Sequence, residues 1–71
     1  MISYEPLFKT LEKKKMTLTE FRKKTGIATA TLAKFRKNES MTLMMLDKIC
    51  TAINCNVEDI VEITDGYMYY I

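Results

Sequence analysis

The chain has 71 residues, of which 48% are hydrophobic, and a formal net charge of +2. This length suits one small domain, which buries only about 60% of its chain surface and therefore has a thin core. Two cysteines without any histidine cannot complete a zinc site, and we expect them to be reduced core thiols. No segment approaches the roughly 18 apolar residues of a membrane span, and the N-terminus lacks the pattern of a signal peptide. We therefore expect a cytoplasmic protein with no membrane association.

The positive charge lies almost entirely in the N-terminal part of the chain. Residues 1–40 hold ten Lys or Arg against four Glu, a net charge of +6, whereas residues 41–71 hold one Lys against five acidic residues, a net charge of −4. Such a division favours a basic face turned toward a polyanion. Solvated helix surfaces would produce the same totals, so charge alone leaves both interpretations open.

The first predicted element is an amphipathic helix over about residues 4–14. Its apolar side chains recur at the spacing of one helix face, and Ser3 precedes them as the expected N-cap. The residues of this apolar stripe are Tyr4, Leu7, Phe8 and Leu11.

The second predicted helix covers about residues 18–25. Thr17 and Glu20 have the spacing of a capping box, in which each side chain accepts a hydrogen bond from the backbone N–H of the other residue. Gly26 is expected to end this helix, because glycine adopts the left-handed backbone conformation without strain. Leu18 and Phe21 are expected to face inward.

A third helix is predicted over about residues 29–37, with Leu32 and Phe35 facing inward. Its outward face is small at the N-terminal end and cationic further along. The residues of this outward face are Thr29, Ala30, Lys34 and Lys37.

Two more short helices are predicted, one over about residues 43–53, capped by Ser40 or Thr42, and one that begins at Asn56. Their expected inward residues are Leu43, Leu46, Ile49, Cys50, Ile53, Val57, Ile60 and Val61. The tail, residues 64–71, is rich in strand formers and allows a short C-terminal strand. The expected fold class is all-α: a compact five-helix bundle formed by residues 1–63, followed by this tail.

The predicted helices on either side of Gly26 make a helix-turn-helix pattern. Small residues at the start of the later helix would let its backbone approach the major groove of DNA, which admits an α-helix. The surrounding Lys and Arg would neutralise phosphates. A helix–glycine–helix pair also joins many ordinary bundles, so this pattern alone does not establish DNA binding.

A resemblance to a known family extends over about residues 5–63. The XRE-type regulators, which are the phage-repressor and Cro class of helix-turn-helix proteins, are similar in element order and spacing to the stretch LTEFRKKTGIATATLAKFRKNESMTLMMLDKICTAINCNVEDIVEI. The resemblance implies a fold like that of phage-repressor DNA-binding domains. It also implies a transcriptional regulator, expected to be a repressor, that binds double-stranded DNA as a homodimer on a palindromic operator.

The resemblance further implies which residues contact DNA. Members of this class read base edges at positions that match Thr29, Ala30 and Lys34, and they commonly touch phosphates at positions that match Thr31 and Lys37. Thr17, at the start of the preceding helix, and Arg36, beside Lys37, are two more phosphate candidates. For each of these residues the alternative is an ordinary solvated position on a helix surface.

Three residues depart from the usual pattern of the class. Leu18 stands where a member often has a glutamine that points at DNA. Arg22 stands where a small residue usually allows the two helices to cross closely, so its side chain must extend outward. Ala28 replaces the usual serine cap, at a cost of about 1 kcal/mol of stability.

Two questions remain open from the residues alone. The methionines at 41, 44 and 45 and the tyrosine-rich tail either fill the core or form a surface for a second subunit, and we favour pairing through the tail. An antitoxin-like or protein-interaction module with the same fold is the alternative to a DNA-binding regulator. No enzyme is expected, because the chain has no histidine and no phosphate-binding glycine loop, and no cofactor or small-molecule ligand is evident.

Overall fold

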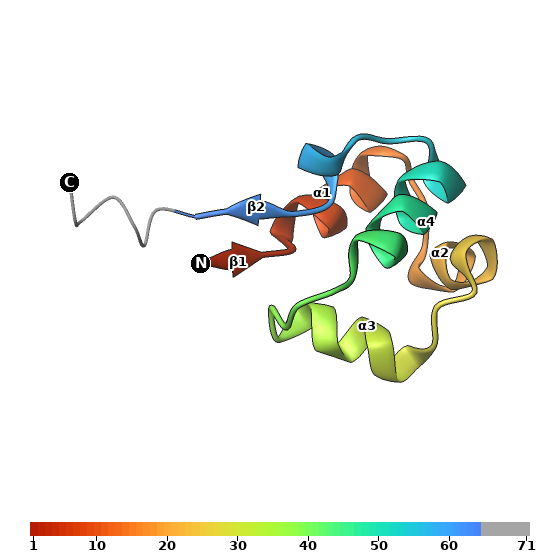
Figure 1. Ribbon diagram of the computed structural model, residues 1–71. Coiled ribbons are helices and arrows are strands. Elements are labelled where there is room, and N and C mark those ends of the chain that lie inside the picture. The colour runs from red at the N-terminus through yellow and green to blue at the C-terminus, as the bar shows by residue number, and fades with distance from the viewer. Residues whose placement is uncertain (65–71) are drawn as a thin grey trace.

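The computed structural model describes residues 1–64, and its ribbon is drawn in Figure 1. The elements in chain order are β1 (Ile2–Ser3), α1 (Glu5–Lys13), α2 (Leu18–Thr25), α3 (Thr29–Arg36), α4 (Leu43–Ile53), the 3-10 turn η1 (Val57–Asp59) and β2 (Glu62–Ile63). The prediction of a mainly helical domain is confirmed. The prediction of five helices is wrong, since residues 1–64 form four α-helices and a two-stranded sheet.

The predicted fifth helix is a single 3-10 turn. Its start is capped as predicted, since the Asn56 N–H donates to Asp59 Oδ2 at 3.0 Å in a capping box. The Asp59 carbonyl, which a longer helix would use for its own bonding, instead accepts from Thr10 Oγ1 of α1 at 2.7 Å. The chain then becomes extended and enters β2.

The small sheet joins the two ends of the described chain. β1 and β2 pair antiparallel, with Ile2 opposite Ile63 and Ser3 opposite Glu62. Beyond this pairing, the Thr64 N–H donates to the Met1 carbonyl at 2.7 Å. The C-terminal strand that we expected in the tail falls mostly on residues 65–71, which lie outside the described residues.

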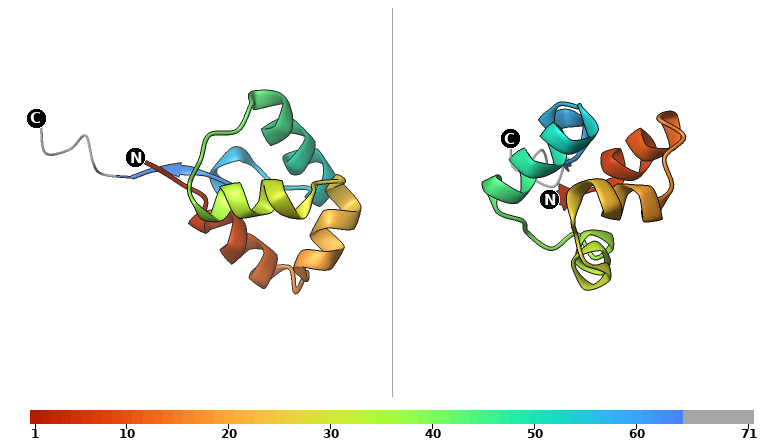
Figure 2. Two further views of the ribbon diagram at one scale, coloured as in Figure 1. Left: turned by 90° about the horizontal axis from the view of Figure 1, so that it is seen from below. Right: turned by 90° about the vertical axis from the view of Figure 1, so that its right-hand side faces the viewer.

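One core joins all four helices. Its buried hydrophobic residues are Tyr4, Leu7, Leu11, Phe21, Ile27, Leu32, Phe35, Leu46, Ile49, Ile53 and Ile60. Most of the predicted inward positions are therefore confirmed. Leu43 and Val57 are the exceptions, because 81% and 53% of their surfaces are exposed. Leu43 opens α4, whose first turn lies at the edge of the molecule in the left panel of Figure 2, where no other element covers it.

Helix α3 lies along one side of the molecule, with α1, α2 and α4 on its other side (Figures 1 and 2). Leu32 and Phe35 are the buried residues of α3 and anchor it to the rest of the domain. The opposite face of α3 is therefore left on the outside of the fold.

Tyr4 fixes the C-terminal end of α3. Its hydroxyl donates to the Glu39 carbonyl at 2.5 Å, and its backbone N–H donates to Asn38 Oδ1 at 3.2 Å. Its ring packs against Phe35, with a centroid separation of 5.2 Å. Burial raises the pKa of the Tyr4 hydroxyl. The start of α1 is thus tied to the last turn of α3 and to the loop that follows it.

Candidate nucleic-acid interface

Helix α2 begins and ends as the local sequence predicts. The Glu20 N–H donates to Thr17 Oγ1 at 3.1 Å, and the Thr17 N–H donates to Glu20 Oε1 at 3.5 Å, which completes the predicted capping box. At the other end, Gly26 has a φ of +72°, and its N–H donates to the Arg22 carbonyl at 2.7 Å. This left-handed residue lets the chain turn sharply into α3.

The three base-reading candidates lie on the exposed side of α3. Ala30 and Lys34 are one helical turn apart, and Thr29 precedes Ala30 at the first position of the helix. All three side chains are exposed, while Leu32 and Phe35 point into the core. The structure therefore brings these candidates together on an accessible surface that is small at one end and cationic at the other.

Two of the phosphate candidates, Thr31 and Lys37, belong to α3 itself, and Thr17 is the N-cap residue of α2. Lys37 is the exposed C-cap residue of α3. Thr31 is half-buried and lines a shallow hollow with Lys34 and the first turn of α4. Thr17 is exposed at the start of α2, although its hydroxyl is already engaged with Glu20. Whether any of these residues touches a phosphate stays a prediction.

Arg36, the fourth phosphate candidate, is directed toward α1. Its guanidinium carbon lies 4.9 Å from the centroid of the Phe8 ring, a cation–π geometry. Through this contact, Arg36 links α3 to α1. The sequence contains no local signal for it, because Phe8 and Arg36 are far apart in the chain.

Arg22 extends outward, as the sequence predicts for a large residue at this position. Its side chain is exposed, and its Nε donates to the Ile27 carbonyl at 3.4 Å. The guanidinium of α2 thus reaches across to the segment that leads into α3. A small residue at this position would leave the Ile27 carbonyl without this donor.

Two further departures from the usual pattern are visible in the structure. Leu18 is half-buried and packs against the core, so the first turn of α2 offers an apolar side chain at this position. Ala28 is the N-cap residue of α3 and makes no side-chain capping bond. Thr42, by contrast, caps α4 by accepting from the Met45 N–H at 3.1 Å.

The cations near α2 and α3 have no acidic partners within the described part of the chain. The single ion pair among residues 1–64 joins Lys9 and Glu5 on α1, at 3.5 Å. Exposed cations without carboxylate partners are available to pair with the charges of a polyanion. This face is therefore suited to a polyanion, which is one of the two interpretations that the division of charge along the chain left open.

Cys50 and Cys55 are free thiols, as the sequence predicts. Asn54 has a φ of +55°, and this left-handed residue turns the chain back, so that the Cys55 N–H donates to the Cys50 carbonyl at 3.0 Å. Burial, together with the neighbouring Cys50, raises the pKa of Cys55 to about 11. Among the described residues there is no cluster of metal-ligating side chains and no helix long and apolar enough to cross a membrane.

The comparisons with known proteins agree with this geometry. The family model described as "Cro/C1-type HTH DNA-binding domain" matches residues 7–66. The crystal structure of the transcriptional regulator VanUg, Form II, is similar with a TM-score of 0.78 and 39% sequence identity, over 86% of this chain and 81% of that one. No curated protein sequence matches at a significant level. With a glycine-linked α2–α3 pair and a family match over most of its length, the chain belongs to the Cro/C1-type helix-turn-helix DNA-binding domains.

Proposed function

We propose that this protein is a small, non-enzymatic transcriptional regulator, a repressor, that binds double-stranded DNA sequence-specifically by inserting α3 into the major groove. The observation that carries the proposal is the exposed face of α3 formed by Thr29, Ala30 and Lys34. On its opposite face, α3 is anchored to the core by the buried Leu32 and Phe35. The similar solved structure is that of a transcriptional regulator, which supports the same role.

Each part of this face suits a different kind of contact. The methyl groups of Thr29 and Ala30 fit against a thymine methyl, and the Lys34 ammonium donates to guanine O6 and N7. Lys37 and Thr31 lie beside the face and suit contacts with phosphates, which fix register without reading sequence.

We further propose that the protein acts as a homodimer on a palindromic operator. Two copies related by a two-fold axis would place their α3 helices in successive major grooves, about 34 Å apart. The exposed Leu43 and Met44 at the start of α4, with 81% and 84% of their surfaces accessible, support an apolar contact with another chain. The tyrosine-rich tail, by its sequence, is a second candidate for this contact.

A protein-interaction module, such as an antitoxin, is the second candidate function. It is favoured by Leu18, which removes a polar group from the start of α2, and by the same exposed Leu43 and Met44. The cationic surface around α3 argues against it, because a protein partner would have to be strongly acidic. An inverted repeat upstream of the gene would favour the regulator, and an adjacent toxin-like reading frame would favour the antitoxin.

Selection of bound sequences from a random pool of DNA duplexes tests the proposed function. We expect an enriched motif made of two inverted half-sites whose centres are about one helical turn, roughly 34 Å, apart. Recovery of a single half-site would retain DNA reading and reject the dimer. Recovery of no motif, together with capture of a protein partner by the same preparation, would favour the interaction module.

A further inference from the structure

The turn between α2 and α3 contains a basic hollow. It has a volume of about 360 Å³ and is lined by Thr19, Arg22, Lys23, Gly26, Ile27 and Ala28. Two of these six residues are cationic and none is acidic. Gly26 has no side chain and Ala28 only a methyl group, so little side-chain volume fills the hollow at these two residues. We call this hollow the turn pocket.

Arg22 is held at one edge of the turn pocket by its backbone contact. Its Nε donates to the Ile27 carbonyl at 3.4 Å, and its two terminal nitrogens make no hydrogen bond within residues 1–64. No carboxylate of residues 1–64 forms an ion pair with Arg22 or Lys23. A guanidinium with free terminal nitrogens presents a planar fork of donors, which matches the geometry of a phosphate.

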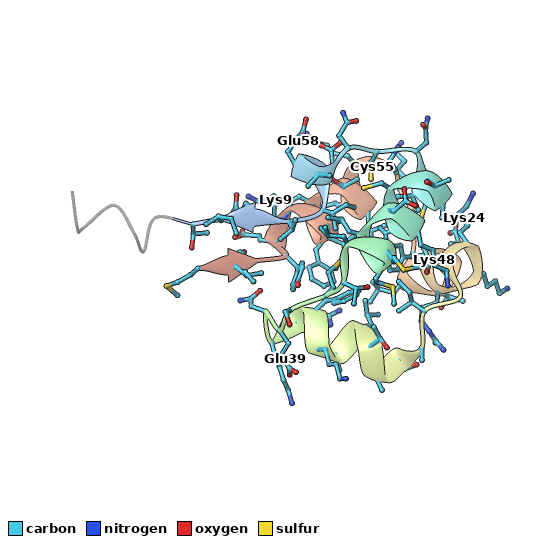
Figure 3. The ribbon with its side chains drawn as sticks, viewed as in Figure 1. Lys9, Lys24, Glu39, Lys48, Cys55 and Glu58 are labelled. Atoms are coloured by element: carbon cyan, nitrogen blue, oxygen red, sulfur yellow. The ribbon has the colours of Figure 1, made fainter. Side chains whose placement is uncertain are left out.

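A third cation reaches the same turn from α4. A Cβ atom added to Gly26 would lie 3.5 Å from Lys48 Nζ, so the Lys48 ammonium lies directly beside the turn. Lys48 is labelled in Figure 3. The Lys48 charge also suits the C-terminal end of α2, where the helix dipole favours cations. Arg22, Lys23 and Lys48 thus place three positive charges around the turn, and none of them has an acidic partner within residues 1–64, so this region attracts anions.

The position of the turn pocket indicates which anion this is. Ala28 lines the pocket, and the next residue in the chain, Thr29, is the first residue of the face proposed to read bases. The pocket therefore adjoins the proposed DNA-binding face. We propose that the turn pocket binds one backbone phosphate of DNA in each protomer, with Arg22 and Lys23 as its ligands and Lys48 adding positive charge. This inference rests on the proposed DNA-binding function. It makes Arg22 a residue that sets the register of α3, since the same guanidinium holds both the turn and the phosphate.

Charge-matched variants test this site. Lys23→Ala removes a pocket cation that makes no hydrogen bond within the described residues, and Lys24→Ala removes a neighbouring α2 cation that does not line the pocket. We expect Lys23→Ala to weaken operator binding about tenfold and to reduce the salt slope by about one unit per protomer, whereas Lys24→Ala changes affinity less than about twofold. Equal losses for the two variants would overturn the site, because they would show a general effect of charge.

The Arg22 variants separate the fork from the charge. Arg22→Lys keeps the charge and loses the Ile27 contact, and Arg22→Gln loses the charge. In a phosphate-ethylation interference experiment, we expect the wild-type protein to be blocked by ethylation of one additional phosphate per half-site that no longer matters for Arg22→Gln. An unchanged interference pattern for Arg22→Gln and Lys23→Ala would reject the pocket as a phosphate site while leaving DNA binding in place.

A probe without DNA distinguishes failure of the site from failure of the proposed function. Pyrophosphate titrated into the 15N-labelled full chain should shift the amide signals of Gly26, Ile27 and Ala28 in the wild-type protein and in Lys24→Ala, but not in Lys23→Ala. These shifts in a protein that binds no duplex would reject the DNA function and retain the anion site. Absence of the shifts, together with normal operator binding by Lys23→Ala, would reject the site alone.

Discussion

At the scale of single residues, the proposed function assigns different contacts to two lysines of α3: Lys34 reads a base and Lys37 contacts a phosphate. Lys34 stands on the exposed face one turn after Ala30, and Lys37 is the C-cap residue at the end of the helix. Base contacts carry sequence information, whereas phosphate contacts mostly do not. The two positions should therefore respond differently to the same substitution.

We expect Lys34→Ala to cost about 1–3 kcal/mol of binding free energy on the operator and to relax the preference at one base pair per half-site. Lys37→Ala should weaken binding to all sequences alike and reduce the salt slope by about one unit per protomer. Fluorescence anisotropy with the operator and with an unrelated duplex of equal length measures both effects. If Lys34→Ala lowered both affinities equally, Lys34 would be a phosphate contact, and specificity would come from Thr29, Ala30 or DNA shape.

Tyr4 carries a prediction about stability. Tyr4→Phe keeps the ring against Phe35 and removes the hydroxyl that donates to the Glu39 carbonyl. We expect a loss of about 1 kcal/mol in the free energy of unfolding, because the carbonyl loses its donor in a partly buried place. For a domain of this size the melting temperature should fall by about 4–8 °C, measurable by circular dichroism. An unchanged melting temperature would show that water replaces the hydroxyl without cost.

Cys55 predicts a dependence of stability on pH. Its pKa is raised from 9.0 to about 11, so between these values the unfolded chain ionises this thiol while the folded chain keeps it protonated. Stability from this group is therefore complete below pH 9 and is lost as the pH rises toward 11. Urea titrations across this range should show a falling midpoint that is shallower in Cys55→Ala. Equal slopes for the two proteins would contradict a contribution of Cys55 to the fall.

At the scale of elements, the two ends of α2 and the start of α4 were the most predictable parts of the structure. The N-cap expected at Ser3 was wrong, because α1 begins directly after Tyr4, which makes no side-chain capping bond. The Thr17–Glu20 capping box, the left-handed Gly26 and the Thr42 cap all depend on residues within one turn of each other, so their signals are local. The β1–β2 pairing depends on residues about sixty positions apart, and each strand is too short to show an alternating pattern. The contact of Arg36 with Phe8 also joins residues far apart in sequence and was missed for the same reason.

The N-cap of α3 offers a direct test of these local rules. Ala28 has the extended backbone of an N-cap, with φ −75° and ψ 156°, but lacks a side-chain acceptor. Ala28→Ser should therefore stabilise the domain by about 1 kcal/mol, and Thr42→Ala, which removes the existing cap of α4, should destabilise it by a similar amount. Chemical unfolding of both variants measures the two changes. A destabilised Ala28→Ser would mean that the hydroxyl does not reach the N–H groups of α3.

At the scale of the whole molecule, the basic part of the sequence is also the part that folds into the helix-turn-helix. The sequence placed most of the positive charge in residues 1–40, and the structure places the helix-turn-helix within this part and leaves its cations without acidic partners in the described chain. The sequence was enough to predict which residues lie on the outer face of α3. It was not enough to predict the directions of long side chains such as Arg22 and Arg36, because these depend on contacts across the fold.

The salt dependence of DNA affinity tests the central claim most directly, because it requires no knowledge of the operator. Fluorescence anisotropy of the full chain on genomic duplexes, repeated between about 50 and 200 mM salt, gives the slope of log affinity against log salt concentration. We predict a steep linear fall, with a slope of about −0.9 for each phosphate that the basic face neutralises. Binding that is independent of salt, or absent at low salt, would contradict the account.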